Sequence, residues 1–137
     1  MIRTFYFGRV LNKGTAHNQL VGGITWGIGQ ALLEQAEYDG STGLLINANL
    51  GEYLLPVHAD VPDIDVTMID KPDLIASPVL GAKGVREIGI VGVATTIANA
   101  VFNATGVRIR DLPISPKSFY REVRALDSRS HENWTGN

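Results

Sequence analysis

The sequence predicts an α+β fold, because segments with strand character and segments with helix character alternate irregularly along the chain. Short stretches are rich in aromatic and β-branched residues, and two longer stretches carry apolar residues at helical spacing. No internal repeat and no linker-like stretch interrupts the 137 residues, a length that fits one domain. We therefore expect a mixed sheet with two long glycine-containing helices and a C-terminal helix.

Three segments are predicted to be strands. The first is "RTFYFGRVL" at residues 3–11, which combines aromatic and β-branched residues. The second is "LLINANL" at 44–50, which follows the turn sequence "DGSTG". The third is "IDVTMID" at 64–70, in which apolar and polar residues alternate. Residues 12–18 are expected to form a loop between the first strand and the first helix.

Two segments have the apolar spacing of helices, residues 19–38 and residues 88–106. The first contains four glycines, each of which lowers helix propensity by roughly 1 kcal/mol relative to alanine; they are Gly22, Gly23, Gly27 and Gly29. A helix that retains so many glycines is expected to have one thin face, against a partner segment or a ligand. Gly106 is a typical C-terminal stop for the second helix.

A third helix is predicted at residues 115–126, with a start signal at its first two positions. Ser115 is a favourable N-cap residue, and Pro116 suits the first helical position because it needs no amide donor there. The polar sequence "DSRSHENWTGN" follows at residues 127–137 and is expected to be a disordered tail.

Composition excludes several classes of function. A net charge of −2 argues against a nucleic-acid or anionic-membrane surface. No window approaches about 18 consecutive apolar residues, so no transmembrane helix is expected. The first ten residues are too mixed for a signal peptide. The absence of cysteine excludes disulfides, a cysteine nucleophile and an iron–sulfur cluster held by this chain alone, and it is compatible with the cytoplasmic location that we expect.

Glu87 is the lone carboxylate in the glycine-rich stretch "GAKGVREIGIVG" at residues 81–92. It precedes the second predicted helix, so its carboxylate is expected near the positive end of the helix dipole. A carboxylate among glycines and apolar residues is a candidate general base. The alternative is a first-turn acid that stabilises the helix by about 0.3–1 kcal/mol. The residues alone leave both interpretations open.

Gln19 stands at the predicted start of the first helix, where free amide groups suit anions and the nearby glycines permit close approach. The glycine spacing is not that of the dinucleotide-binding fingerprint, and a helix that merely packs through its glycines is the alternative. No serine stands in a G-x-S-x-G motif, so a hydrolase elbow is not supported.

No metal site is expected from the side chains. His17, His58 and His131 share no metal-ligand spacing. The acidic cluster at residues 60–65 lacks the glycine turn and the closing glutamate of a calcium-binding EF-hand loop. We interpret these carboxylates as solvated loop charges.

Four stretches together resemble the C-terminal end of the molybdenum-binding subunit of the xanthine oxidase/aldehyde oxidase family, and in particular bacterial aldehyde or xanthine dehydrogenases with separate subunits. They are "FGRVLN" at 7–12, Q-x-x-G-x-x-x-x-G-x-G at 19–29, and the segments 47–66 and 81–114. The stretches follow the family's order and cover nearly all of residues 7–116. The resemblance implies that residues 1–126 are the C-terminal part of a molybdopterin-binding domain.

The resemblance also implies roles for individual residues. Glu87 matches the family's catalytic glutamate, the last residue of a K-G-x-G-E stretch. Gln19 matches the glutamine that hydrogen-bonds the pterin cofactor. Lys83, Gly84 and Gly89 match the loop that wraps the cofactor and the base.

The sequence departs from the family pattern at Arg86, where the family usually has glycine. A bulky cation directly before Glu87 acts on that carboxylate through its charge, narrows the pocket, or turns outward harmlessly. This departure puts full activity in doubt.

The family hydroxylates an aldehyde or N-heterocycle carbon with water as the oxygen source. Its cofactor is molybdopterin with molybdenum, here expected in the cytosine dinucleotide form, and pterin sulfurs rather than side chains hold the metal. The implied partners are the remainder of the molybdenum-binding subunit, and separate domains or subunits that carry iron–sulfur clusters and FAD. The implied substrate is a small aldehyde or purine-like molecule, and a periplasmic location is left open for a parent complex.

The chain alone is expected to be inactive, because 137 residues are too few to enclose so large a cofactor. One alternative is a non-catalytic interaction or assembly module that keeps the fold and forms a homo-oligomer when isolated. Another is a small anion-binding or nucleotide-binding domain built on the glycine-rich helix starts. The sequence does not predict which substrate is used, because specificity in this family comes largely from residues upstream of the matching region.

Overall fold

The computed structural model of the chain describes residues 1–134, with side chains described as far as residue 125. The described chain divides into two compact units. The first unit consists of residues 1–27 and 56–93, and the second consists of residues 28–55 and the chain from residue 94 onward. All five predicted site residues, Gln19, Lys83, Gly84, Glu87 and Gly89, belong to the first unit.

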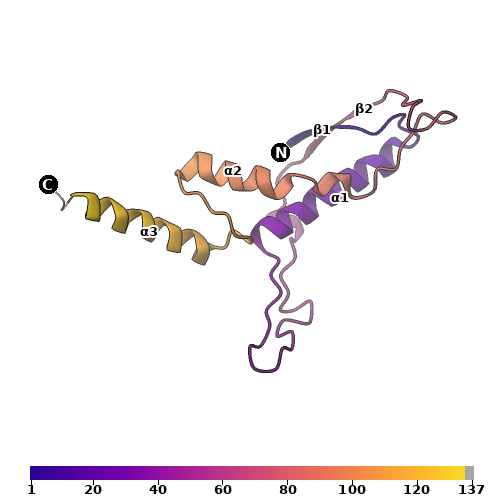
Figure 1. Cartoon of the computed structure of the whole chain (residues 1–137). Helices are drawn as coiled ribbons and strands as arrows, with labels where there is room; N and C mark the ends of the chain where they lie inside the picture. Colours follow the sequence, from indigo (N-terminus) through magenta and orange to yellow (C-terminus); the bar gives the residue numbers. More distant parts are fainter. Residues whose placement is uncertain (135–137) are drawn as a thin grey trace. The chain divides into compact units, whose positions relative to one another are not determined.

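A two-stranded parallel sheet belongs to the first unit (Figure 1). Strand β1 (Ile2–Tyr6) pairs with β2 (Asp65–Ile69). The third predicted strand therefore lies where the sequence places it, and the first ends earlier than predicted. Gly8, with φ of +82°, instead forms an isolated antiparallel bridge with Ala82. The sheet and the helices confirm the α+β class.

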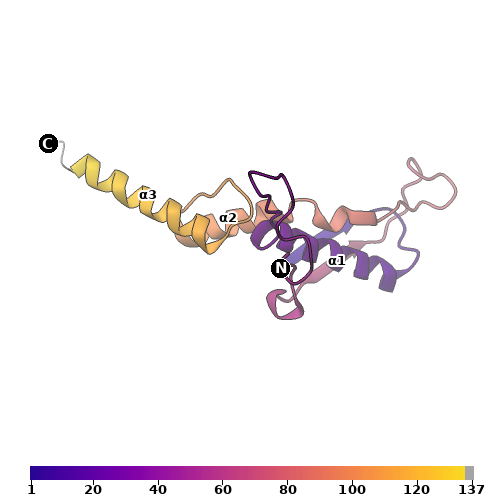
Figure 2. The ribbon, with the colours of Figure 1, turned by 90° about the horizontal axis from the view of Figure 1, so that it is seen from below.

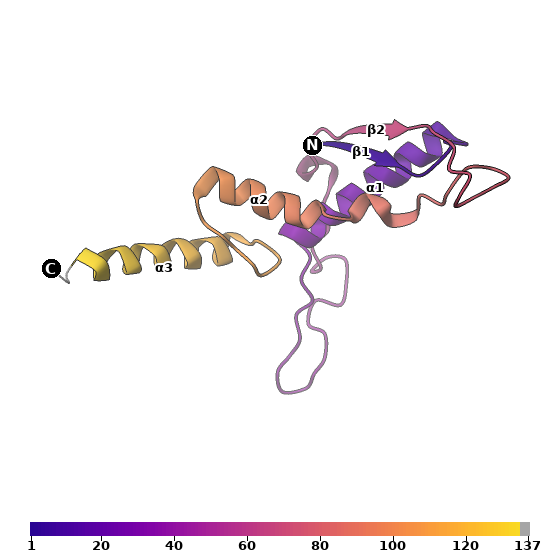
Figure 3. The ribbon, with the colours of Figure 1, turned by 45° about the horizontal axis from the view of Figure 1, so that its top comes forward.

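Helix α1 (Lys13–Leu32) begins within the segment that the sequence predicts to be a loop. The side chain of Asn12 supplies the reason, because its Oδ1 accepts a hydrogen bond from the Thr15 amide at 3.0 Å. Eight residues of α1 are buried, and most of them share one face of the helix; they are Ala16, Leu20, Gly23, Ile24, Gly27, Ile28, Gly29 and Ala31. Figure 3 shows the first-unit part of this helix along the two strands.

The buried face of α1 is thin where the sequence predicts it to be, and the partner is a segment of the same chain. A Cβ added to Gly23 would lie 2.8 Å from the Cα of Gly89 and 2.9 Å from the Ile90 nitrogen. One added to Gly27 would overlap the side chain of Val93. Gly22, by contrast, has open space around it.

The second predicted helix is divided into two. The 3₁₀ helix η2 (Arg86–Ile90) comes first, and α2 (Val93–Thr105) follows it. Gly92 separates the two elements with φ of +75°, a left-handed conformation that interrupts a helix. Gly106, with φ of +72°, ends α2 as the sequence predicts, and its amide donates to the Phe102 carbonyl at 2.7 Å.

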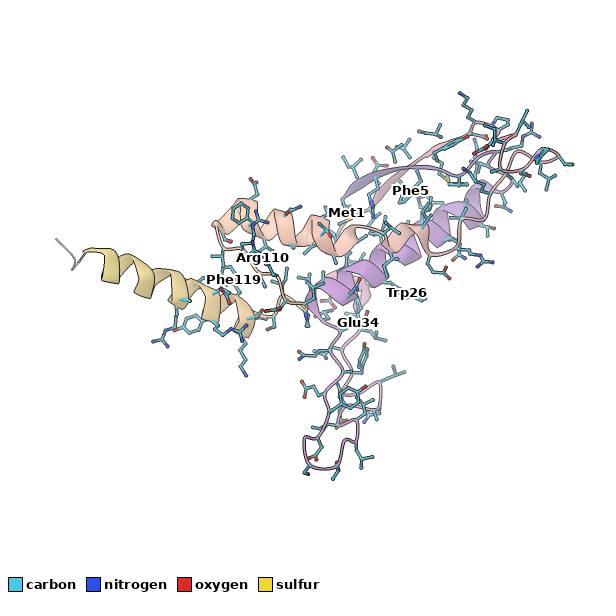
Figure 4. The ribbon with its side chains drawn as sticks, in the orientation of Figure 1. Met1, Phe5, Trp26, Glu34, Arg110 and Phe119 are labelled. Atoms are coloured by element: carbon cyan, nitrogen blue, oxygen red, sulfur yellow. The ribbon has the colours of Figure 1, made fainter. Side chains whose placement is uncertain are left out.

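The second unit has its own small core. Val107, Ile109 and Ile114 are buried and pack with neighbouring apolar side chains, which are Leu32, Ile97, Ala98, Val101 and Phe119. Figure 2 shows the helices α2 and α3 of this unit, and Figure 4 labels Phe119 near the start of α3. The core residues between the two helices form no strand, although their sequence has an extended pattern.

Helix α3 (Pro116–Trp134) starts as predicted, because the Ser118 amide donates to the Ser115 hydroxyl oxygen at 3.1 Å. It also runs further than predicted. The backbone of residues 127–134 is helical, where the sequence suggests a disordered tail. Residues 135–137 lie outside the described residues, so the prediction stays untested there.

The predicted strand at residues 44–50 is wrong. That segment forms one isolated bridge, between Tyr38 and Leu45, within a loop that follows α1. The buried side chain of Asn47 makes the hydrogen bonds that a neighbouring strand would make in a sheet. Its Oδ1 accepts from the Glu37 amide at 2.9 Å, and its Nδ2 donates to the Gln35 carbonyl at 2.7 Å. The side-chain amide thus satisfies backbone groups that a neighbouring strand would otherwise bind.

Residues Arg86–Thr105 form one stretch that is long and apolar enough to cross a membrane by length and composition alone. Core helices of soluble proteins can have the same length and composition. Gly92 interrupts the stretch. Only 11% of its most apolar segment of 18 residues is buried. The stretch is therefore an apolar segment that this chain leaves largely uncovered.

Candidate functional site

Two pockets of the first unit contain the predicted site residues. The larger, which we call the cationic pocket, has a volume of about 270 Å³ and is lined by Phe7, Arg9, Leu11, Asn12, Thr15, Ala16, Gln19, Ala82, Lys83, Val85 and Arg86. The smaller, which we call the glutamate pocket, has a volume of about 150 Å³ and is lined by Gln19, Gly22, Gly23, Trp26, Arg86 and Glu87. Gln19 and Arg86 line both pockets, so the two are neighbours.

Gln19 is brought to both pockets by α1. Because α1 begins at Lys13, Gln19 lies in the second turn and not at the helix start, which corrects the expectation from the sequence. Its backbone amide is therefore not one of the free donors of a helix N-terminus. What Gln19 offers to a ligand is its side-chain amide, which carries both a donor and an acceptor.

Glu87 lies in the first turn of η2, and α2 starts only at Val93. The expectation that its carboxylate lies near the N-terminus of the long helix is therefore wrong. Its backbone departs from helical geometry, with φ of −87° and ψ of +19°. The side chain is exposed in this chain and borders the glutamate pocket.

Lys83 is held at the wall of the cationic pocket by two partners. Its Nζ lies 2.7 Å from a carboxylate oxygen of Asp73 and 4.9 Å from the centre of the Tyr6 ring. The hydrogen bond with Asp73 raises the pKa of Lys83, and the same bond, together with the Ala76 amide, lowers the pKa of Asp73. The ammonium group therefore stays charged where it faces the pocket.

The two predicted cofactor-loop glycines differ in their surroundings. Gly84 is exposed, and the nearest atom to an added Cβ would be the Arg86 Cγ at 3.9 Å. Gly89 is buried, and an added Cβ would overlap the carbonyl oxygen of Leu20. Neither glycine lines the cationic pocket or the glutamate pocket. Their contact with a cofactor stays a prediction.

Arg86, like Gln19, lines both pockets. It has φ of +39°, a conformation that residues with a side chain rarely adopt and that glycine adopts freely. This geometry gives a physical reason for a glycine at the corresponding position of the family pattern. The arginine lines both pockets, so its side chain borders the site and does not turn away from it.

Sequence reasoning gave no site role to most of the lining residues, among them two polar side chains and one large aromatic one. Arg9 and Asn12 line the cationic pocket, and Trp26 lines the glutamate pocket while remaining exposed on α1 (Figure 4). A signal for the first two was present, because both belong to the stretch "FGRVLN" at 7–12.

Among residues 1–125, whose side chains the structure describes, no group of three or more histidine, cysteine, aspartate or glutamate residues could hold a metal ion. Asp60, Asp63 and Asp65 are exposed and do not form such a group.

Comparison with known proteins places this arrangement in a family. Residues 5–62 match the family described as "Molybdopterin cofactor-binding domain". The aldehyde oxidoreductase molybdenum-binding subunit PaoC of Escherichia coli K12 is 48% identical over 108 residues, which are 79% of this chain and 15% of PaoC. The putative xanthine dehydrogenase molybdenum-binding subunit XdhA of the same organism is 37% identical over 115 residues, 84% of this chain and 15% of XdhA. The chain belongs to the family of these molybdenum-binding subunits.

A solved structure supports the same assignment. The crystal structure of quinoline 2-oxidoreductase from Pseudomonas putida 86 matches with a TM-score of 0.78 and 31% identity, over 90% of this chain and 16% of that one. The resemblance and the α+β fold that the sequence predicts are thus confirmed. The chain spans about 15% of the length of the molybdenum-binding subunits it matches.

The residues of the cationic pocket fit one edge of a molybdenum–pterin cofactor. Arg9, Lys83 and Arg86 line the pocket together with polar side chains, and no carboxylate lines it. Cations and amides suit the phosphate and the hydrogen-bonding edge of a pterin. A volume of about 270 Å³ is at the low end for sites that enclose even a small ligand. This lining suits one wall of a cofactor site and not a complete enclosure.

Proposed function

We propose that this chain is the part of a molybdopterin-dependent hydroxylase or dehydrogenase that supplies a glutamate base and pterin contacts. The reaction is the oxidation of a small aldehyde or N-heterocycle, with water as the source of oxygen. The observation that carries the proposal is that Gln19 lines both the cationic pocket and the glutamate pocket. A group bound against Gln19 and Lys83 would therefore lie next to Glu87.

Each of these side chains has a role in the proposed site. Gln19 orients the pterin through its side-chain amide, and Lys83, fixed by Asp73, offers positive charge to the cofactor. Glu87 accepts the proton that the attacking water gives up and holds it on a carboxylate oxygen. When bound, the molybdenum cofactor supplies the two-electron redox chemistry that no side chain of this chain provides.

The proposed base needs a water-poor environment, which the chain alone does not provide, since Glu87 is exposed. We propose that the remainder of the molybdenum-binding subunit covers Glu87 and holds the other side of the cofactor. The chain would then be inactive by itself. The further partners would be domains or subunits that carry iron–sulfur clusters and FAD.

The cofactor form and the location are extensions of the same proposal. A cytosine dinucleotide form of molybdopterin would bring an additional phosphate, which suits a pocket with three cations. The proposed location is the cytoplasm. Separation of the extracted cofactor by mass would test the first point, and cell fractionation would test the second.

Glu87→Gln tests the assigned base. In the complete enzyme, this change should lower turnover by about 100- to 10,000-fold, because the proton acceptor is lost while the shape is kept. Molybdenum and pterin content should stay unchanged. Glu122→Gln is the matched control, because Glu122 lies on α3 and outside both pockets. Normal turnover of Glu87→Gln would refute the assigned role.

A second candidate function is a non-catalytic assembly module that keeps the fold. The observation that favours it is the number of large apolar side chains that face solvent, among them Ile75 at 97% exposure and Val79 at 90%. The molybdenum and pterin content of the chain, purified with its partners from the native source, separates the two functions. An assembly module would contain neither component.

A further inference from the structure

We propose that Arg3 is a positioning residue for Glu87, which it fixes indirectly by binding the carbonyl groups at the end of η2. The inference rests on the proposed role of Glu87 as the base. Arg3 lines neither the cationic pocket nor the glutamate pocket, so it acts through the backbone that carries the base and not on a ligand.

Two hydrogen bonds join Arg3 to the end of η2. Its Nη1 donates to the Gly89 carbonyl at 3.0 Å, and its Nη2 donates to the Val91 carbonyl at 2.5 Å. The two bonds connect residues 86 and 88 positions apart in the sequence. The planar fork of a guanidinium group holds two acceptors in a fixed geometry, which a lysine ammonium on its flexible stem does not.

Strand β1 and the Phe5 ring hold the guanidinium group in place. Arg3 stands opposite Val66 in the parallel pair, and the Phe5 ring lies on the same face of the strand, with its centre 5.3 Å from the Arg3 Cζ. Phe5 is itself buried, and Figure 4 shows it between β1 and α1. Arg3, its stacking partner Phe5 and the proposed base Glu87 therefore all belong to the first unit.

The backbone hydrogen bonds at the two ends of η2 are long. The Ile88 amide donates to the Val85 carbonyl at 3.2 Å, and the Val91 amide donates to the Ile88 carbonyl at 3.3 Å, both at the long end of the usual range. The last carbonyls of a helix have no partner within it. Arg3 supplies partners for Gly89 and Val91 at the point where Gly92 turns the chain away.

Helix α1 holds the same turn from another side. Gly89 fits so closely against Leu20 and Gly23 that neither glycine has room for a Cβ. Gln19 directly precedes Leu20 in α1, and Glu87 stands two residues before Gly89 in η2. Contacts with α1 and β1 together therefore set the distance between Gln19 and Glu87 across the glutamate pocket.

Arg3→Met in the complete enzyme tests the inference, because methionine keeps an unbranched stem and removes the donors. The kcat should fall by about 10- to 100-fold, as expected when a reacting group is misplaced by roughly 1 Å. The KM and the molybdenum content should stay unchanged. Arg3→Lys should lower kcat less, since it keeps the charge but not the fork. An unchanged kcat for Arg3→Met would overturn the inference.

Arg108→Met is the matched control. The Arg108 guanidinium also lies over a ring, 3.6 Å from the centre of Phe102, and it donates to the Asn99 Oδ1 at 3.3 Å. It belongs to the second unit and lines neither pocket. Its replacement should leave kcat within about twofold of the original value. If Arg108→Met lowered kcat as much as Arg3→Met does, the loss would follow from removing any ring-stacked arginine. That result would overturn the specific role of Arg3.

Amide hydrogen exchange in the full chain gives a readout that does not depend on activity. Arg3→Met should speed exchange about tenfold or more at residues 86–92, because that turn loses its external hydrogen bonds. Exchange along β2 should change little. Unchanged exchange at 86–92, or an equal rise in both segments, would show that Arg3 does not act on η2 in particular.

A double variant separates this inference from the proposed function. If Arg3 acts through Glu87, then Arg3→Met should cause no further loss of turnover in a Glu87→Gln background. A full additional loss there would overturn the inference while leaving Glu87 as the base. Normal turnover of Glu87→Gln alone would instead reject the proposed function on which the inference rests.

Discussion

At the residue scale, the ion pair of Lys83 and Asp73 shows how one side chain of the site is placed. Asp73 begins a turn in which its carboxylate accepts from the Ala76 amide at 3.0 Å, and its own amide donates to the Gly81 carbonyl at 2.8 Å. The turn therefore closes on itself just before Lys83, and the 2.7 Å contact with Asp73 directs the lysine. The sequence identified Lys83 but gave no sign of this partner, which lies ten positions earlier.

The ion pair predicts a specific dependence of stability on pH. Because the pKa of Asp73 is lowered from 3.8, its contribution is present above that value and is lost as the pH falls through the lowered pKa. Because the pKa of Lys83 is raised from 10.5, its contribution is present below that value and is lost as the pH rises through the raised pKa. Asp73→Asn should therefore lower the Tm at neutral pH but not at a strongly acidic pH below the lowered pKa of Asp73.

Thermal unfolding followed by circular dichroism checks this dependence. Asp63→Asn is the matched control, because Asp63 is exposed and its side chain makes no ion pair within the described residues. Added salt should shrink the difference between Asp73→Asn and the original chain, since the pair is partly open to solvent. An equal effect of Asp73→Asn at neutral and strongly acidic pH would contradict the electrostatic account.

At the scale of elements, the glycine face of α1 decides where η2 and the start of α2 lie. Gly23 admits Gly89, and Gly27 admits Val93, so two backbone segments approach more closely than any other residue type would allow. The sequence predicts this thin face because the glycines lower the helix propensity of the segment and are nevertheless present in it. It does not predict that the partner is the turn carrying Glu87, because helical periodicity carries no information about which segment packs there.

Gly22 and Gly23 give a paired test of that face. Gly22→Ala should raise the free energy of unfolding by about 0.5–1 kcal/mol, since alanine favours the helix and an added Cβ meets open space. Gly23→Ala should lower it by about 1–3 kcal/mol, because the Cβ would be forced against the Gly89 backbone. Urea denaturation of the full chain measures both changes. Equal effects of the two changes would show that the face is not closely packed.

At the scale of the whole molecule, the described chain leaves many large apolar side chains in contact with solvent. Four of them lie in the single turn between Asp73 and Gly81; they are Leu74, Ile75, Val79 and Leu80. Monomeric soluble proteins rarely expose such groups together. A chain that spans about 15% of its relatives is expected to have surfaces that other segments cover in those proteins.

The exposed apolar turn predicts self-association of the isolated chain. Sedimentation velocity should show oligomers at micromolar concentration, and the double change Ile75→Lys and Val79→Lys should reduce them by removing the two most exposed side chains of the turn. Gln30→Lys with Asn103→Lys is the control, because it adds the same charge at exposed polar positions. A monomeric original chain would contradict the prediction, as would equal dissociation by both pairs of changes.

The sequence by itself determined the class of the fold, two of the strands, the helix boundaries at Gly106 and Ser115, and the residues that mark the family. These features depend on local preferences of φ and ψ, on capping groups and on periodicity, all of which are written in neighbouring residues. The misplaced start of α1 and the wrong strand at 44–50 arose where two asparagine side chains, Asn12 and Asn47, outweighed the local pattern.

Only the tertiary structure decided which distant residues meet. It brought Gln19 and Glu87 to one pocket, joined Arg3 to Gly89 across 86 positions, and gave Arg86, which lines both pockets, its left-handed conformation. The physical reason is that such contacts depend on how closely whole elements pack. Packing distance is set by glycine faces, buried side chains and hydrogen bonds between segments, and no single stretch of sequence contains that information.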